Sequence, residues 1–444
     1  MLKAGLRKTR ELGTGEIAKA SLVSLVVTLT GLSVAFAQAV FAARLLGATN
    51  YGTVAVAMAV VQILGVLCLS GFGDLAVREV AARMAASDSG STIHFVRRAL
   101  AIVIALSIAS AMVLAIIVST TGLVPRSYRP ALEVGALLVP PIALIGLFRG
   151  TAQGFGAILQ AQAPGELVRP AVTVFLLASV AVLGLDFGAV DYMWLAFAAA
   201  LISAVTAAAW LWIKAPASLR SKSEVTNQTV RLNAALPFLG LGLTAMLQAQ
   251  INTLLLGGFA SPHEAGLFQP IVRIAPLLTL AGQAAGMRYA PRIAKHWQRG
   301  EREEIRWVTR TFTWTTSLLT LILALAIAAS GPWLMVIFGS EFRQVAPLLW
   351  VIAAAQVFNA ACGPVGYLLT MSGAGSRALM GQLAGLTVNA LAGMLLIPEH
   401  GALGAAIAMA AGIVMWNLAM LPMATRRHGF DPTIATIFRG KAFG

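Results

Sequence analysis

An arginine inside an apolar stretch has the clearest potential for chemistry in this sequence. Arg273 lies within the run 266–289, flanked by Pro270 and Pro276. Prolines inside a helix bend it and free backbone groups, and broken helices tend to line cavities in transporters. A guanidinium binds phosphate or carboxylate bidentately and stays charged. The position predicts an anion site, and the alternative is a structural arginine bonded to freed carbonyls.

Amide side chains recur in neighbouring apolar stretches. Amides can bind sugar hydroxyls, but in lipid they also hold helices together. Gln248 and Asn252 are four residues apart and share one helix face. Gln269 and Gln38 lie in the eighth and first apolar runs. We expect these four side chains to face a substrate cavity, whereas the asparagines further along the chain, among them Asn359, Asn389 and Asn417, are expected to join helices.

Acidic residues, histidines and cysteines show no arrangement for catalysis or metal binding. The acidic residues nearest the apolar runs lie at their ends or in loops: Asp74, Glu133, Glu166, Asp186, Asp191 and Glu399. None of the five histidines stands at metal or acid–base spacing from a carboxylate. Both cysteines, Cys68 and Cys362, lie in apolar runs as small packing residues. We therefore expect no catalytic residue, no metal and no cofactor. The sequence does not identify a coupling ion, for which H⁺ and Na⁺ are the candidates.

The elements that position these residues must be membrane helices. Of the 444 residues, 58% are hydrophobic and only 11% are charged, with a mean hydropathy of +0.83. Ordinary soluble domains carry about 25% charged residues. The apolar runs are continuous and about 20 residues long, which fits spanning helices and not alternating barrel strands. The sequence predicts an all-α polytopic membrane protein.

About twelve transmembrane helices are expected. The predicted spans are 20–44, 52–72, 98–121, 131–151, 166–184, 190–213, 234–259, 266–289, 309–330, 345–370, 377–397 and 402–423.

The basic residues predict the orientation. With both termini in the cytoplasm, 27 of the 32 Lys and Arg residues fall on the cytoplasmic side. Cytoplasmic loops collect such residues, so this topology explains the net charge of +15 without a nucleic-acid partner.

The chain divides into two six-helix lobes. The polar stretch 214–232 predicts a cytoplasmic linker between an N-terminal lobe, 1–213, and a C-terminal lobe, 233–425, followed by a cytoplasmic tail, 426–444. Glycines recur at separations of 214, 213 and 219 residues: Gly52 with Gly266, Gly73 with Gly286, and Gly154 with Gly373. Six spans per repeat make the repeats parallel, which predicts a central cavity between two bundles.

Two stretches carry a family resemblance. They are Leu45-Leu46-Gly47-x3-Tyr51-Gly52 with Gly71-Phe72-Gly73 and Arg78-Glu79, and Asn389 with Ile397-Pro398 and Gly401-Ala402-Leu403-Gly404-Ala405-Ala406. With them the chain resembles the Wzx-type oligosaccharide flippases of the multidrug/oligosaccharidyl-lipid/polysaccharide exporter superfamily. The resemblance implies a two-lobed V shape, as in the multidrug exporters of that superfamily. It also implies translocation of polyprenyl-pyrophosphate-linked oligosaccharide across the bacterial inner membrane for O-antigen, capsule or exopolysaccharide synthesis. The implied partners are the lipid-linked oligosaccharide, membrane lipid, and glycan polymerase or chain-length proteins.

The resemblance also suggests roles for three further arginines. It places Arg44 at the central cavity, and an interfacial position is the alternative. Arg149 and Arg169, at the cytoplasmic ends of spans, would guide the lipid headgroup or simply set topology. Two other functions remain open. A cation-coupled drug antiporter of the same superfamily needs a buried carboxylate, and a glycan-processing membrane enzyme would carry a large periplasmic loop.

Overall fold

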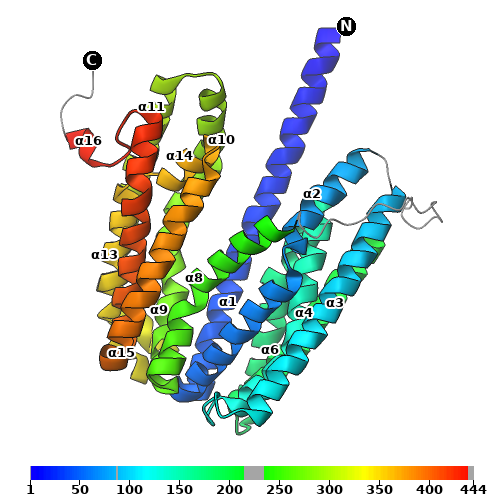
Figure 1. Ribbon diagram of the computed structural model, residues 1–444, viewed down its shortest axis with the longest axis vertical. Helices are drawn as coiled ribbons and strands as arrows, with labels where there is room; N and C mark the ends of the chain where they lie inside the picture. Colours follow the sequence, from blue (N-terminus) through cyan, green and yellow to red (C-terminus); the bar gives the residue numbers. More distant parts are fainter. Residues whose placement is uncertain (1, 87–88, 215–234, 439–444) are drawn as a thin grey trace. The chain divides into compact units, whose positions relative to one another are not determined.

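The computed structural model describes residues 2–86, 89–214 and 235–438 (Figure 1). Every regular element in these ranges is a helix. Nine of the described helices are long and apolar enough to cross a membrane, and one bent pair adds a tenth. The predicted all-α polytopic fold is therefore confirmed. Apart from its first residue, the predicted linker 214–232 lies outside the described residues.

Two long helices each contain two predicted spans. Helix α1 (Leu2–Leu69) breaks at Gly47, where φ is 66° and ψ is 170°. Helix α15 (Gly375–His428) breaks at Gly401, with φ 51° and ψ −128°. The bent pair, α13 (Leu348–Ala361) and α14 (Val365–Met371), turns by 44° and forms one span. Counted with these breaks, the described helices match the twelve predicted spans.

The chain forms two compact units. Unit 1 comprises Met1–Leu46 and Ala57–Met246, and unit 2 comprises Gly47–Val56 and Leu247–Gly444. The predicted lobe boundaries stay a prediction. The remaining elements are α2 (Phe72–Ala85), α3 (Ser89–Thr120), α4 (Arg129–Gly154), α5 (Ile158–Ala163), the π-helix η1 (Pro164–Val168), α6 (Arg169–Leu183), α7 (Ala189–Lys214), α8 (Leu236–Phe259), α9 (Pro262–Ile274), the 3-10 helix η4 (Ala275–Thr279), α10 (Leu280–Gln298), α11 (Arg302–Ala329), α12 (Gly331–Phe338), the 3-10 helix η5 (Ser340–Val345) and α16 (Ala435–Phe438).

In unit 1, α4 packs against α2, α3 and α7 (Figure 1). A methyl group on Gly150 would lie 2.0 Å from the carbonyl oxygen of Gly73, so only glycine allows α2 and α4 to approach this closely.

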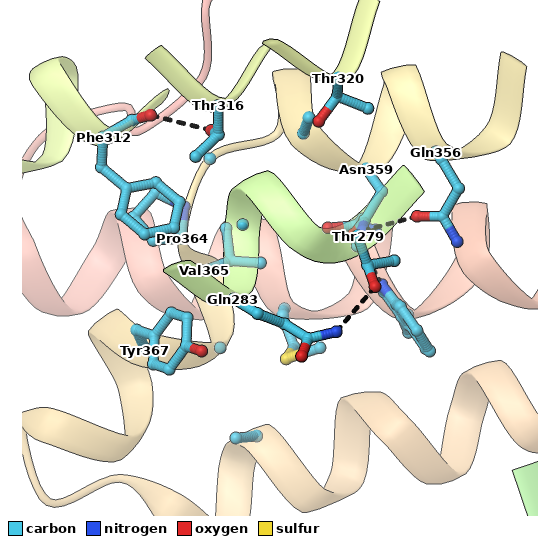
Figure 2. A pocket seen from close by; sticks show the side chains of 18 of the residues that line it. Thr279, Gln283, Phe312, Thr316, Thr320, Gln356, Asn359, Pro364, Val365 and Tyr367 are labelled. Atoms are coloured by element: carbon cyan, nitrogen blue, oxygen red, sulfur yellow. Dashed lines mark hydrogen bonds between the residues drawn. The ribbon is translucent and has the colours of Figure 1, made fainter. Parts of the chain in front are cut away.

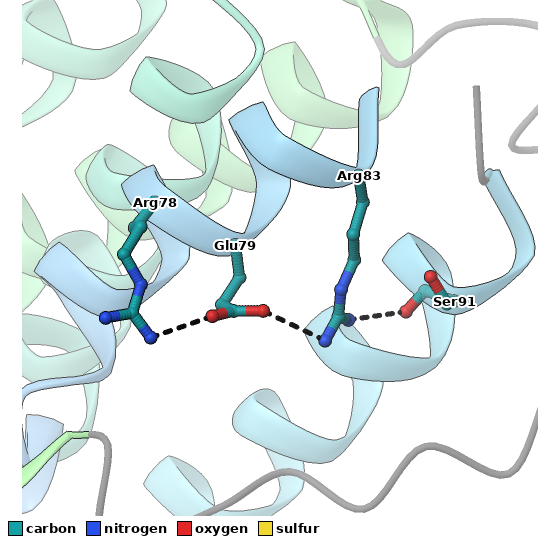
Figure 3. A network of polar contacts seen from close by, with 4 residues as sticks. All are labelled: Arg78, Glu79, Arg83 and Ser91. Atoms are coloured by element: carbon teal, nitrogen blue, oxygen red, sulfur yellow. Dashed lines mark hydrogen bonds and ion pairs between the residues drawn. The ribbon is translucent and has the colours of Figure 1, made fainter. Parts of the chain in front are cut away.

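A polar chain joins α2 to α3 at one end of unit 1 (Figure 3). Glu79 binds Arg78 at 2.9 Å and Arg83 at 3.1 Å, and Arg83 donates to the carbonyl oxygen of Ser91 at 2.8 Å. The Arg83 guanidinium also lies 4.9 Å from the centre of the Phe95 ring. These contacts hold the C-terminal part of α2 against the first turns of α3.

In unit 2, the equivalent glycines of the predicted sequence repeat lie where two helix starts pack against each other. Gly52 would place a methyl group 1.7 Å from the Pro262 carbonyl oxygen, and Gly266 would place one 1.8 Å from the Ala48 carbonyl oxygen. Each pair of equivalent residues differs by 214 positions, the separation found in the sequence. The contact is therefore self-complementary, as expected where two copies of one motif pack about a local two-fold axis.

The eighth predicted span is broken, but not as the sequence suggested. Helix α9 continues through Pro270, and the backbone tightens to the 3-10 form only at Ala275–Thr279, around Pro276. A second break, which the sequence analysis did not predict, separates α13 from α14 at Gly363, where φ is 76°. The chain after α15 covers this break, because the Ile434 N–H donates to the Ala361 carbonyl at 2.9 Å.

Candidate functional site

A cavity of about 510 Å³ lies inside unit 2. It is lined from α8, η4, α10, α11, α13, α14 and α15, and none of the described residues in its lining is charged. The amides are Gln248, Gln283, Gln356, Asn359, Gln382 and Asn417. The hydroxyl groups are those of Thr279, Thr316, Thr320, Tyr367 and Thr370. Phe312 and Trp416 add aromatic surface to that of Tyr367.

The two helix breaks form part of the cavity wall. The 3-10 turn η4 ends at Thr279, whose hydroxyl donates to the Pro276 carbonyl at 2.8 Å. Gln283, one turn later, donates to the same hydroxyl at 2.8 Å. On the other side, Gly363 and Pro364 leave the helical path between α13 and α14 and line the cavity directly. Broken helices thus shape a polar space within an apolar bundle.

Asn359 is the centre of the amide network. Its Oδ1 accepts from Nδ2 of Asn417 at 2.8 Å and from Nε1 of Trp416 at 3.2 Å. Its Nδ2 donates to Oε1 of Gln356 at 3.2 Å. Gln356 and Asn417 are 5% and 1% exposed, so these bonds are protected from water and hold the side chains in fixed orientations.

Aromatic rings cluster on the other side of the cavity in Figure 2, opposite the amides of Gln356 and Asn359. Phe312 and Tyr367 pack edge to face with ring centres 6.1 Å apart. A methyl group on Gly286 would lie 2.2 Å from the Tyr367 hydroxyl oxygen, so this glycine makes room for the tyrosine. The cavity therefore combines hydrogen-bonding groups with apolar ring surface.

The amides predicted from the sequence separate in the structure. Gln248 lines the cavity and donates to the Gln382 carbonyl at 3.0 Å. Asn252, one turn further on α8, is buried away from the cavity lining, and its Oδ1 has no hydrogen-bond partner within the described part of the chain. Gln269 is also buried, and it donates to Thr253 and to its own helix at 3.2 Å. It connects α8 to α9 and does not line the cavity.

Arg273 is exposed near the C-terminal end of α9, directly before η4. It does not line the cavity of unit 2, and it forms no ion pair or hydrogen bond with the described part of the chain. Of the two prolines expected to disturb the helix beside it, only Pro276 lies where the backbone changes to the 3-10 form. Its anion-binding role stays a prediction.

Four of the predicted site residues belong to unit 1. The side-chain amide of Gln38 donates a hydrogen bond to the Tyr192 hydroxyl at 2.8 Å. At least one of its amide hydrogens is therefore already bonded within unit 1. Arg44 is exposed shortly before the break in α1. Arg149 forms an ion pair with Glu166 at 3.3 Å, which joins α4 to η1.

The fourth, Arg169, is half-buried at the start of α6. The substrate and headgroup roles of all four residues stay predictions.

Sequence reasoning missed most of the cavity. Asn359 and Asn417 were expected to join helices, and they do hydrogen bond between α13 and α15, but they also line the cavity. Gln356 was not singled out. A signal was present, because Gln356 and Asn359 are three residues apart, share a helix face, and precede the Gly363-Pro364 break.

Comparison with solved structures defines the class of fold. An inward-facing multidrug resistance MATE family transporter of the MOP superfamily matches with a TM-score of 0.74 at 14% identity, covering 95% of this chain and 99% of that one. The lipid II flippase MurJ, in an inward closed conformation, matches with a TM-score of 0.68 at 12% identity, covering 91% and 87%. The chain therefore shares the fold of these two proteins.

Sequence comparison adds the family. Residues 17–297 match the family described as polysaccharide biosynthesis protein, and the chain belongs to that family. It is also 29% identical over 193 residues to EpsK of Bacillus subtilis (strain 168), an uncharacterized membrane protein. That alignment covers 42% of this chain and 37% of EpsK, so it spans little more than a third of that relative. The protein is thus a multi-span membrane protein of the polysaccharide biosynthesis protein family.

Proposed function

We propose that this protein translocates polyprenyl-pyrophosphate-linked oligosaccharide across the bacterial inner membrane by alternating access, for the synthesis of O-antigen, capsule or exopolysaccharide. The observation that carries the proposal is the uncharged cavity of unit 2, in a member of the polysaccharide biosynthesis protein family. Amides and hydroxyl groups match sugar hydroxyls, and aromatic faces match the apolar faces of sugar rings. The protein is a transporter and not an enzyme of glycan assembly.

Arg273 supplies the anionic half of recognition in this proposal. Its guanidinium is exposed at a broken helix, and no described carboxylate lies within ion-pair distance of it. Such a group can bind a pyrophosphate or an acidic sugar through two parallel hydrogen bonds. The lipid tail stays in the bilayer while the charged headgroup and the glycan move.

Drug export is the second candidate function, and the fold match to a multidrug transporter favours it. A cationic drug and its coupling ion would be expected to bind a buried carboxylate. The cavity lining contains none. The chemistry of the site therefore supports a neutral or anionic substrate over a cationic one.

A flipping assay separates these functions. Purified protein in proteoliposomes receives lipid-linked oligosaccharide, and the glycan that reaches the opposite leaflet is measured by its accessibility to an added lectin. We expect Arg273→Ala to slow flipping about tenfold or more, because a hydrogen bond to a charged group contributes roughly 1.5–3 kcal/mol. Arg273→Lys should retain part of the rate.

The matched control is Arg343→Ala, which removes another exposed arginine of unit 2. Equal rates for Arg273→Ala and the wild-type protein would refute the role of this arginine. Transport of drug cations without glycan flipping would refute the proposed function, as would hydrolysis or polymerisation of the glycan by the purified protein.

The proposed topology places both termini in the cytoplasm. The distribution of basic residues supports it. A green fluorescent protein fused to the C-terminus should fluoresce, because this reporter matures in the cytoplasm, and alkaline phosphatase fused at the same site should be inactive. The reverse result would overturn the orientation.

A further inference from the structure

We infer that the cavity of unit 2 is a subsite for one uncharged sugar residue of the transported glycan, and that it excludes acidic sugars. The inference rests on the proposed function, since it names the part of the substrate that this cavity recognises. It assigns a role to Gln283 and Trp416.

Several donors and acceptors of the cavity are free to bond a ligand. Asn359 Oδ1 already accepts two bonds, and Gln356 Oε1 accepts one. No bond to a described residue uses the Nε2 hydrogens of Gln356 or the Oε1 of Gln283. The cavity therefore offers both donors and acceptors. Sugar hydroxyls, each of which donates and accepts, match this mixed set better than a group of one polarity.

The second argument is the orientation of the aromatic side chains. The indole Nε1 of Trp416 donates to Asn359 at 3.2 Å, so the ring is fixed by the same amide that connects α13 to α15. Tyr367 packs edge to face against Phe312 and fits closely against Gly286, where a side chain would clash with its hydroxyl group. Rings fixed in this way present apolar surface without losing conformational entropy when a ligand binds. A pyranose has an apolar face of C–H groups that can cover such a surface.

The third argument is charge. A uronic acid would bring its carboxylate into a space without a lining cation, and an unpaired charge away from water is unfavourable. A neutral sugar meets no such penalty. The volume of about 510 Å³ also falls within the roughly 300–1,000 Å³ of small-molecule sites. Charge recognition and sugar recognition therefore lie at different places in unit 2, the former proposed at Arg273.

Ligand-observed NMR tests this subsite directly. The full-length protein is placed in nanodiscs free of sugar-headed detergent, and saturation transfer is measured to N-acetylglucosamine and to glucuronic acid. We expect binding of the neutral probe and little binding of the acidic one. Gln283→Leu and Gln248→Leu should each weaken the neutral probe about three- to tenfold, the effect of one lost hydrogen bond. Gln250→Leu is the matched control for Gln248→Leu, because both residues lie on α8 and Gln250 does not line the cavity.

A gain of binding protects the test against loss of folding. Gln283 is exposed at the cavity edge, so Gln283→Lys should be accommodated and should add a cation to the lining. We expect this variant to bind glucuronic acid more tightly than the wild-type protein does. Equal or tighter binding of glucuronic acid by the wild-type protein would overturn the inference, as would neutral-sugar binding that none of the cavity variants changes.

The two proposals fail separately. If the protein flips lipid-linked glycan and the cavity variants flip and bind normally, the subsite is wrong and the flippase function stands. If neutral sugar binds in a cavity-dependent manner and no glycan is flipped, the subsite stands and the proposed function is wrong.

Discussion

Helices α15 and α1 each contain a glycine break, at Gly401 and at Gly47. After each of these two breaks, a glutamate from another part of unit 2 caps the helix that restarts there. At Gly401, Oε2 of Glu264 accepts from the Ala402 N–H at 2.7 Å, and at Gly47, Oε1 of Glu341 accepts from the Ala48 N–H at 2.8 Å. Free N–H groups at a helix start carry partial positive charge and favour an anion. Each glutamate thus acts as an N-cap supplied by tertiary structure. We predict that removing Glu264 destabilises unit 2.

The magnitude follows from this geometry. A hydrogen bond to a charged group contributes roughly 1.5–3 kcal/mol, and the helix dipole adds about 0.3–1 kcal/mol. Glu264 is half-buried, so we expect Glu264→Ala to lower the free energy of unfolding by about 2–3 kcal/mol. Glu264→Gln keeps an acceptor and should lose about half of that. Glu341 is exposed, so the same change there should have a smaller effect.

Thermal unfolding in nanodiscs measures the effect. For a unit of about 200 residues, 2–3 kcal/mol corresponds to a fall in Tm of roughly 4–12 °C. The control is Glu399→Ala, which removes an exposed glutamate two residues before the same break. A fall in Tm no larger for Glu264→Ala than for Glu399→Ala would refute the capping argument. So would an equal loss from the Gln and Ala variants at position 264, because the hydrogen-bond acceptor that Gln keeps would then contribute nothing.

Three other predictions follow from local geometry. Gly266→Ala should lower the Tm by several degrees, because its methyl group would lie 1.8 Å from the Ala48 carbonyl oxygen, and a normal Tm would contradict that contact. Arg149→Ala should change the Tm very little, because its ion pair with Glu166 is exposed, so a transport defect in this variant would support headgroup guidance and normal transport would count against it. The pKa of Glu301 should lie below its usual range, chiefly because of a hydrogen bond from a histidine. Any stability from this pair is therefore present at neutral pH and is lost as the pH falls through the lowered pKa. A carboxyl NMR titration of Glu301 in the usual glutamate range would contradict this prediction.

The sequence predicts the helices well, because a membrane span leaves a direct record in hydropathy. It predicts less well where they break. Pro270 suggested a break and yet lies inside α9, where the helix continues despite the hydrogen bond that a proline removes. Gly363, which does break a span, resembles many other glycines of this chain. Only the packing of Pro432 against that position distinguishes it, and this contact depends on residues almost 70 positions apart.

The glycine repeat was the most informative pattern in the sequence. Similar separations of 214, 213 and 219 residues predicted that Gly52 and Gly266 are equivalent, and the structure shows the two helix starts in contact. The cavity could not be predicted in the same way. Its lining comes from seven elements, and whether an amide faces it depends on helix rotation. Gln269 and Gln356 are equally buried amides on spanning helices, yet only Gln356 lines the cavity.

The distribution of charge gives these proposals a common physical basis. In lipid a fixed charge is costly unless it has a partner, so a binding surface in the bilayer should hold charge only where the substrate brings the opposite charge. The cavity of unit 2 has none, and its polar groups are amides and hydroxyls that partly satisfy one another when no ligand is bound. Such a site stays stable when empty and exchanges internal hydrogen bonds for those of a sugar. A transporter that must release its substrate gains from this exchange, because it limits the affinity for the glycan.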